Sequence, residues 1–188
     1  MDAAPLMARS LGPMPVGKRM LTVDEQLVGA PVHVIFDLAR DVEQWPARLP
    51  HYRWVRFRER TADGGGVVEM AAWRPFGRLR WPTWWLSDMA VDDARPAVRF
   101  QHIGGITRGM DVEWSFERRG TGTAVRIVHV WDGPRWPVIG GPAATILIGP
   151  VFIHGIASRT LAGLAVAAER AAGSNDRVGP NQSKGEIE

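Results

Sequence analysis

The sequence predicts a single α+β domain in which a curved antiparallel sheet wraps around one long C-terminal helix. Three observations favour this class. Between residues 52 and 132, short alternating segments are separated by glycine- and proline-rich turns, which is the spacing of a meander and not of strand–helix units. Apolar residues at helical spacing occur near the start of the chain and again close to its end. The length of 188 residues suits one domain with two loose ends.

The elements follow in a β-α-α-β6-α order. The first strand is expected at 19–29. Pro31 suits the first position of a helix over 31–40, and the proline-bounded stretch 45–50 predicts a second helical turn. The other six strands are expected at 52–61, 67–74, 79–91, 97–103, 106–118 and 123–132.

The last element is a helix expected at 150–172, where Pro150 begins it and Gly173 caps it. Its apolar residues form a stripe at helical spacing, and its many alanines and glycines allow close approach to another surface. A seven-stranded sheet curls, and this helix is the long apolar cover for its concave face. The arrangement predicts an internal cavity within a domain at 19–172, flanked by a flexible arm at 1–18 and a disordered tail at 173–188.

Composition excludes several classes of function. The chain has no cysteine, which excludes disulfides, thiolate nucleophiles and cysteine metal sites. The net charge of +3 is too small to indicate a nucleic-acid partner. No apolar run is long enough for stable membrane insertion and no secretory signal is visible, so we expect a cytoplasmic protein. The five histidines lack close ligand spacing, so neither a metal nor another cofactor is expected.

Strand alternation predicts which side chains point inward. The inward set combines aromatic and apolar residues with three polar ones: Trp85, Ser87, Met89, Val98, Phe100, His102, Met110, Val112, Trp114, Phe116 and His129. Over 123–132 the alternation is ambiguous, because both faces contain apolar residues, and Trp131 points inward in one of the two assignments. A core built only for stability avoids polar groups without partners. Ser87, His102 and His129 among tryptophans therefore favour a wet or ligand-filled cavity. The alternative is that each histidine makes one internal hydrogen bond and has no further role.

Two parts of the chain resemble a known family. The segments Ala30–Leu38, Asp41–Pro46 and Leu49–Tyr52 resemble the opening of the START-like (Bet v 1-like, SRPBCC) superfamily, which includes the polyketide cyclases and aromatases. The segments Met110–Phe116 and Arg126–His129 resemble the single-domain polyketide aromatase/cyclases more narrowly. The resemblance covers about residues 20–172 and implies a helix-grip fold.

In that family the pocket binds a long poly-β-ketone chain and guides an aldol closure with loss of water. Carried over by position, Trp45, Leu49 and Tyr52 would form the mouth and wall of the pocket. The interior would be lined by Trp85, Ser87, Met110, Trp114 and His129. One position departs from the pattern, because Met89 stands where these cyclases tend to place an interior arginine, which would polarise a ketone or hold an enolate. His102 would be a second basic position deeper in the sheet.

These observations lead to two hypotheses. In the first, the protein is a cofactor-independent cyclase of secondary metabolism in which His129, Tyr52, Ser87 and His102 supply proton transfer and oxyanion contacts. The substrate, a small hydrophobic or aromatic molecule, would then contact Trp45, Leu49, Trp85, Met89, Met110, Val112, Trp114 and Trp131, and an acyl carrier protein is a candidate second partner. In the second, the protein is a non-catalytic carrier of a lipid, quinone or aromatic metabolite, which needs only the pocket.

Overall fold

The computed structural model describes residues 10–76, 79–133 and 141–176. Within these ranges the elements are β1 (Met20–Val28), α1 (Val32–Arg40), a 3-10 turn η1 (Val42–Gln44), α2 (Trp45–Arg48), β2 (Tyr52–Arg60), β3 (Gly66–Phe76), β4 (Leu79–Asp92), β5 (Ala97–Gly105), β6 (Asp111–Arg119), β7 (Gly122–Trp131) and α3 (Gly141–Asp176). The predicted fold class and element order are confirmed.

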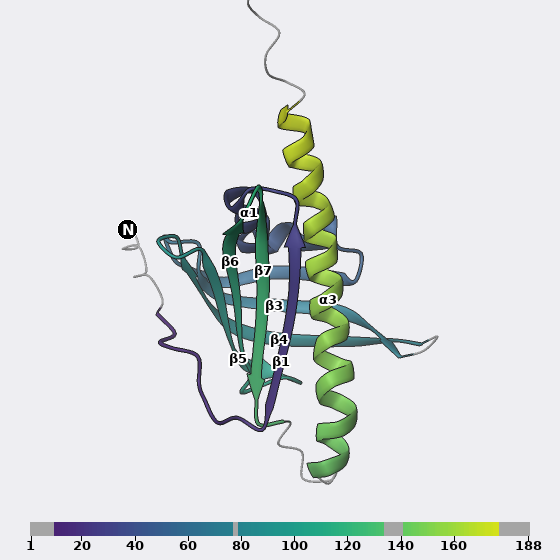
Figure 1. Ribbon diagram of the computed structural model, residues 1–188. Coiled ribbons are helices and arrows are strands. Elements are labelled where there is room, and N and C mark those ends of the chain that lie inside the picture. Colours follow the sequence, from purple (N-terminus) through teal and green to yellow (C-terminus); the bar gives the residue numbers. More distant parts are fainter. Residues whose placement is uncertain (1–9, 77–78, 134–140, 177–188) are drawn as a thin grey trace, which may run out of the picture.

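The seven strands of the described chain form one antiparallel sheet in the order β1-β7-β6-β5-β4-β3-β2. The first and last strands along the chain, β1 and β7, are therefore neighbours in the sheet, with Met20 opposite Trp131 and Val28 opposite Thr123. Figure 1 shows the strands turning from nearly parallel to α3, at β1 and β7, to nearly crosswise, at β3 and β4. The strand direction thus changes across the sheet, as the twist between neighbouring strands predicts, and the sheet curves around α3.

The predicted beginning of the last helix is wrong. The helix begins at Gly141 instead of Pro150, and it continues past Gly173 to Asp176. Proline fixes φ near the helical value and removes only one backbone hydrogen bond, so the chain on both sides can remain helical. A glycine at the expected cap position is likewise tolerated inside a helix at a modest cost.

One strand boundary differs by more than two residues. The strand expected at 106–118 begins at Asp111, and the residues before it form a tight turn. In this turn Met110 N donates to the carbonyl oxygen of Thr107 at 3.1 Å, and His102 N donates to that of Met110 at 2.8 Å. Gly109 has φ +87°, which a side chain would disfavour. The turn places the Thr107 hydroxyl beside the His102 ring.

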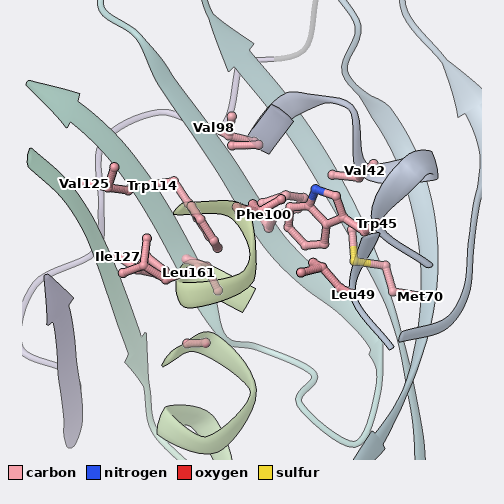
Figure 2. Packing of buried hydrophobic residues seen from close by; sticks show 14 of the residues in the cluster. Val42, Trp45, Leu49, Met70, Val98, Phe100, Trp114, Val125, Ile127 and Leu161 are labelled. Carbon is pink, nitrogen blue, oxygen red and sulfur yellow. The ribbon is translucent and has the colours of Figure 1, made fainter. Parts of the chain in front are cut away.

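The core lies between the concave face of the sheet and α3 (Figure 2). Leu161 and Leu164 of α3 are buried there together with Ile127 of β7. A Cβ added to Gly163 would collide with the side chain of Leu49, so the missing side chain lets the helix approach the α2–β2 connection closely. This is the role that the small residues of the helix predict.

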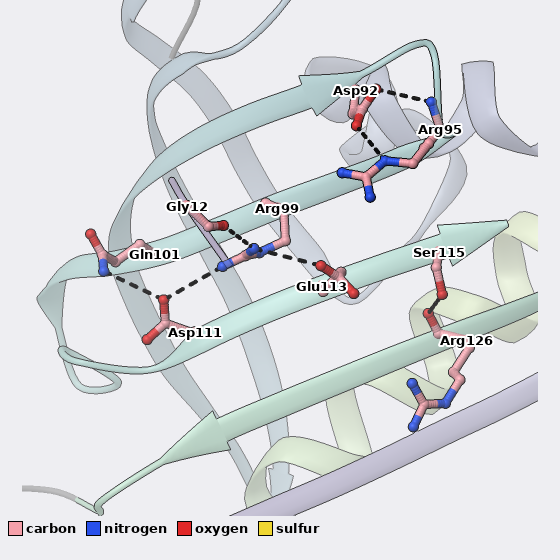
Figure 3. Close-up of polar contacts among 9 residues, drawn as sticks. All are labelled: Gly12, Asp92, Arg95, Arg99, Gln101, Asp111, Glu113, Ser115 and Arg126. Carbon is pink, nitrogen blue, oxygen red and sulfur yellow. Dashed lines mark hydrogen bonds and ion pairs between the residues drawn. The ribbon is translucent and has the colours of Figure 1, made fainter. Parts of the chain in front are cut away.

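The N-terminal segment contacts the outer face of the sheet. Of the arm predicted at 1–18, the structure describes residues from 10 onward. The Gly12 carbonyl accepts a hydrogen bond from Arg99 Nη1 at 2.7 Å (Figure 3). Lys18 Nζ pairs with Asp132 at 2.6 Å. Arg99 also pairs with Glu113, at 3.5 Å. Of the predicted tail, residues 173–176 belong to α3 and 177–188 lie outside the described residues.

We expect Gly66→Ala to lower the free energy of unfolding by about 2 kcal/mol or more. Gly66 has φ +134°, and a Cβ there would collide with the carbonyl oxygen of Glu59 across the β2–β3 hairpin. Chemical denaturation measures the change. Gly120→Ala is the control: its φ is also positive, +59°, but nothing lies within 4 Å of an added Cβ. An equal loss in both variants would mean that backbone conformation alone, and not the collision, sets the cost.

Candidate functional site

A buried cavity of about 70 Å³ lies between the concave face of the sheet and α3. Its walls combine aromatic, apolar and polar side chains from α2, β2 to β7, the β5–β6 turn and α3. The lining residues are Trp45, Tyr52, Met70, Trp85, Phe100, His102, Thr107, Met110, Val112, Trp114, His129, Ile156, Ala157 and Thr160. Concave apolar sites with a few convergent polar groups are typical of small-molecule binding.

Trp45 is the centre of the aromatic wall. The helix α2 brings its ring over the sheet, where its centroid lies 5.1 Å from Tyr52, 5.8 Å from Trp114 and 6.5 Å from Phe100. Its indole N–H donates to the carbonyl oxygen of Leu38 at 3.1 Å, which fixes the ring and satisfies its one polar atom. Figure 2 shows Trp45 beside Phe100, Leu49 and Met70.

His102 is a neutral imidazole inside this wall. Its ring stacks on Trp85 with centroids 6.0 Å apart and an interplanar angle of 16°. Its Nδ1 lies 2.5 Å from Thr107 Oγ1, a contact that depends on the turn before β6. Burial, and to a smaller extent the charge of neighbouring His129, lowers the pKa of His102 from 6.5 to about 3. His102 is therefore uncharged at neutral pH.

His129 reaches the same cavity from β7. Strand pairing places it opposite Val112 of β6 on one side and Thr22 of β1 on the other. Its Nδ1 lies 3.3 Å from Thr22 Oγ1, so one ring nitrogen is oriented by the neighbouring strand. His129 is 7% exposed, and its positive charge would oppose a charge on His102.

Tyr52 and Thr160 form the wall between the sheet and α3. Burial raises the pKa of Tyr52, and the hydrogen bond with Thr160 only partly offsets this, so the phenol keeps its proton at neutral pH. The Thr160 hydroxyl is 2.8 Å from the Ile156 carbonyl oxygen, 3.0 Å from His51 Nε2 and 3.4 Å from the Tyr52 hydroxyl. Since Thr160 has one proton to donate, it must accept from at least one of these rings.

The structure brings together eight of the twelve residues that the sequence proposes for the site. These are Tyr52, His102 and His129 of the proposed acid–base group, and Trp45, Trp85, Met110, Val112 and Trp114 of the proposed binding group. Four lie elsewhere. Ser87 and Met89 are fully buried outside the cavity lining, and the Ser87 hydroxyl has no hydrogen-bond partner among the described residues. Trp131 donates its indole N–H to the Arg108 carbonyl oxygen, and Leu49 lines a separate surface pocket.

Six lining residues are absent from the sequence proposals: Met70, Phe100, Thr107, Ile156, Ala157 and Thr160. The alternation in β5 puts Phe100 on the same face as His102, so that signal was present in the sequence. Thr107 could not be found in this way, because it lies in a turn where the sequence predicts a strand. The helix stripe contains Thr160, but its contact with Tyr52 depends on how α3 rotates against the sheet.

We expect the free energy of unfolding to fall by about 2 kcal/mol between pH 7 and pH 5 because of His102. The unfolded chain takes up this proton near pH 6.5, whereas the folded protein resists it down to about pH 3. The stabilisation is therefore complete above pH 6.5 and is lost as the pH falls toward 3. Urea unfolding at several pH values measures this slope. A His102→Asn variant should have a clearly shallower slope, and an equal slope would contradict the assignment.

Two further properties concern the described residues alone. No three histidine, cysteine, aspartate or glutamate side chains among them gather where a metal ion could bind. Nor does any helix in this part of the chain combine the length and apolar character required to cross a bilayer.

The fold and cavity define a helix-grip protein of the START-like and Bet v 1-like class. Residues 28–150 match the family model described as polyketide cyclase / dehydrase and lipid transport. Because this match spans more than half of the chain, the chain belongs to that family, and the resemblance seen in the sequence is confirmed.

Several individual proteins are similar to the chain in sequence or in fold. A Streptomyces halstedii protein, provisionally named a polyketide cyclase, is 29% identical over 107 residues, which are 56% of this chain and 94% of that protein. The ZhuI aromatase/cyclase of Streptomyces sp. R1128 has a similar fold, with a TM-score of 0.69, 17% identity and coverage of 80% of this chain and 94% of its own. A START superfamily protein of Mycobacterium smegmatis has a TM-score of 0.58 and 16% identity, covering 82% and 98%.

Proposed function

We propose that the protein is an aromatase/cyclase that binds a linear, ketone-bearing intermediate in the internal cavity and promotes its closure into a ring by aldol addition and loss of water. The observation that carries the proposal is that three groups able to hold or move a proton, on Tyr52, His102 and His129, line one cavity whose remaining wall is largely apolar. Family membership supports the same reaction class.

His129 is the proposed base. It would take a proton from the carbon between two ketones, which leaves an enolate whose carbon attacks a second carbonyl and forms the new bond. His102, held neutral by burial, would donate an N–H hydrogen bond to the developing oxyanion, with Thr107 satisfying its other ring nitrogen at 2.5 Å. The neutral state of His102 at neutral pH supports its assignment as the hydrogen-bond donor.

Tyr52 is the proposed acid for the dehydration. After ring closure, His129 would return its proton to the new alkoxide oxygen. In the dehydration, His129 would take the second proton from the same carbon as the C–O bond breaks, while Tyr52, protonated because its pKa is raised, donates its proton to the leaving oxygen to form water. The proton on His129 would then pass back to the Tyr52 oxygen. The aromatic wall would hold the chain folded, which is itself a large contribution to the rate of a cyclisation. The cavity of about 70 Å³ is smaller than the ~300–1,000 Å³ of most ligand sites, so substrate entry requires the side chains of this wall to move.

A carrier of apolar molecules is the second candidate. Met89, which the resemblance places where the cyclases tend to keep an interior arginine, is fully buried, and the described lining contains no arginine or lysine. A cavity without a permanent cation binds an uncharged lipid or quinone readily but stabilises an enolate less strongly. The family description itself includes lipid transport.

One experiment separates the two candidates. A linear poly-β-ketone released by a minimal polyketide synthase cyclises spontaneously into a mixture of products, which liquid chromatography with mass spectrometry resolves. A cyclase should shift this mixture toward one aromatic product at catalytic protein concentrations. A carrier should leave the mixture unchanged and should instead retain a stoichiometric apolar molecule in native mass spectra of the purified protein. An unchanged mixture would reject the cyclase proposal.

A further inference from the structure

A second pocket, of about 400 Å³, lies at the surface beyond the wall that closes the internal cavity. The contact between His51 and Thr160 separates the two spaces, because His51 lines the surface pocket while Thr160 and Tyr52 line the cavity. The surface pocket is formed by the α2–β2 connection, the β3–β4 hairpin and α3. Its lining residues are Arg48, Leu49, Pro50, His51, Trp73, Arg80, Arg159, Ala162 and Gly163.

The charge of this pocket is entirely positive among its described lining. It contains three arginines and no aspartate or glutamate. Arg48 pairs with Asp41 outside the lining at 3.5 Å, whereas none of the ion pairs within the described residues includes Arg80 or Arg159. These two arginines come from β4 and α3, so the fold brings together like charges that are distant in sequence. Gathering them without a counter-ion costs free energy, which an anion in the pocket would offset.

The charge of Arg159 affects the protonation of His51 in the wall between the two spaces. The pKa of His51 is lowered from 6.5 to about 4, first by burial and then by the charge of Arg159. His51 is therefore neutral, and its Nε2 is occupied by the 3.0 Å contact with Thr160. The wall consequently contributes no competing positive charge of its own, and Arg80 and Arg159 remain the groups available to a ligand.

The remaining lining is apolar and includes a large ring. Leu49, Pro50 and Ala162 form an aliphatic floor, and Trp73 contributes an indole. The other charge near this indole, the guanidinium of Arg53, lies 4.6 Å from its ring centroid. Such a combination of a flat apolar surface with guanidinium donors suits a molecule that has a ring or chain at one end and a carboxylate or phosphate at the other. The volume is within the range of small-molecule sites.

We propose that this pocket is a second ligand site, which binds a small organic anion through Arg80 and Arg159 with its apolar body against Trp73 and Leu49. The site is distinct from the reaction proposed for the cavity and does not depend on it. The site would bind an anionic oxygen group, which a free carboxylic acid or a phosphate ester can supply.

The test uses three naphthalene probes on the full-length protein: 2-naphthoate, 2-naphthyl phosphate and the neutral 2-naphthamide, measured by titration calorimetry. In the double variant Arg80→Gln/Arg159→Gln, the affinity for whichever anion the wild type binds should fall at least tenfold. The affinity of this variant for 2-naphthamide should equal that of the wild type. Arg170→Gln removes one charge from an exposed position on the same helix, outside the pocket, and should bind like the wild type. Ala162→Trp should block the pocket without changing its charge.

The probes also identify the class of anion. Tighter binding of the naphthoate assigns the pocket to carboxylic acids, and tighter binding of the phosphate assigns it to phosphate esters. Binding of either anion should weaken as salt is raised, since the contact is exposed. The proposal is overturned if neither anion binds saturably, or if the double variant binds both as well as the wild type does.

Discussion

His129→Ala is expected to slow ring closure by roughly 100- to 10,000-fold, which is the usual contribution of a positioned acid–base group. The change removes the proposed base from the cavity while the neutral donor on His102 stays in place. Rates would be followed as formation of the aromatic product from a linear poly-β-ketone. Binding of a product analogue should weaken only slightly, because the aromatic wall that contacts it is unchanged.

The control for this prediction is His33→Ala, which removes an exposed histidine of α1 outside the cavity lining. It should react like the wild type. His129→Gln tests the role more closely, since glutamine retains a hydrogen-bonding group but cannot take up a proton at neutral pH. A fully active His129→Gln variant would contradict the assignment of His129 as the base.

Trp45→Ala is expected to lower the free energy of unfolding by about 3–5 kcal/mol, the usual cost of deleting a large buried ring. Trp45 is 3% exposed and contacts three other aromatic rings. The variant also leaves the Leu38 carbonyl oxygen without the indole donor. Urea denaturation followed by circular dichroism gives the change.

Trp45→Phe separates the two contributions. It keeps an aromatic ring in the wall and loses the hydrogen bond to Leu38, so a loss of about 1 kcal/mol is expected from the missing bond. If both variants lost the same stability, the hydrogen bond and not the packing would fix α2. Because Trp45→Ala enlarges the cavity, this variant should also accept bulkier apolar ligands, provided that it is assayed where it remains folded.

The strands were predictable because their signals are local. Alternation and glycine-rich turns locate each strand to within a few residues, and the same alternation correctly predicts that Trp85, His102, Trp114 and His129 are buried. The beginning of α3 was not predictable from Pro150, because a proline marks a helix end only when nothing else holds the helix together. A proline removes one backbone hydrogen bond, and this alone does not end a helix.

The site was predictable only in part because a cavity depends on more than inward orientation. Ser87 and Met89 point inward with Trp85, yet only Trp85 reaches the cavity. Which inward residues line an empty space depends on where α3 and α2 cover the sheet. The surface pocket is lined by Arg80 of β4 and Arg159 of α3, and no local pattern in the sequence places these two residues at one pocket.

Among the described residues, exposed and buried tryptophans form two optically distinct groups. Trp81 and Trp84 of β4 are 64% and 51% exposed, whereas Trp45 and Trp114 are 3% and 4% exposed and line the cavity. Acrylamide should quench the red-shifted emission of the first pair while leaving the blue-shifted emission of the second. An aromatic molecule entering the cavity would quench in the reverse order. The unmodified protein therefore contains its own fluorescent reporter, which can distinguish occupation of the interior from binding at the surface.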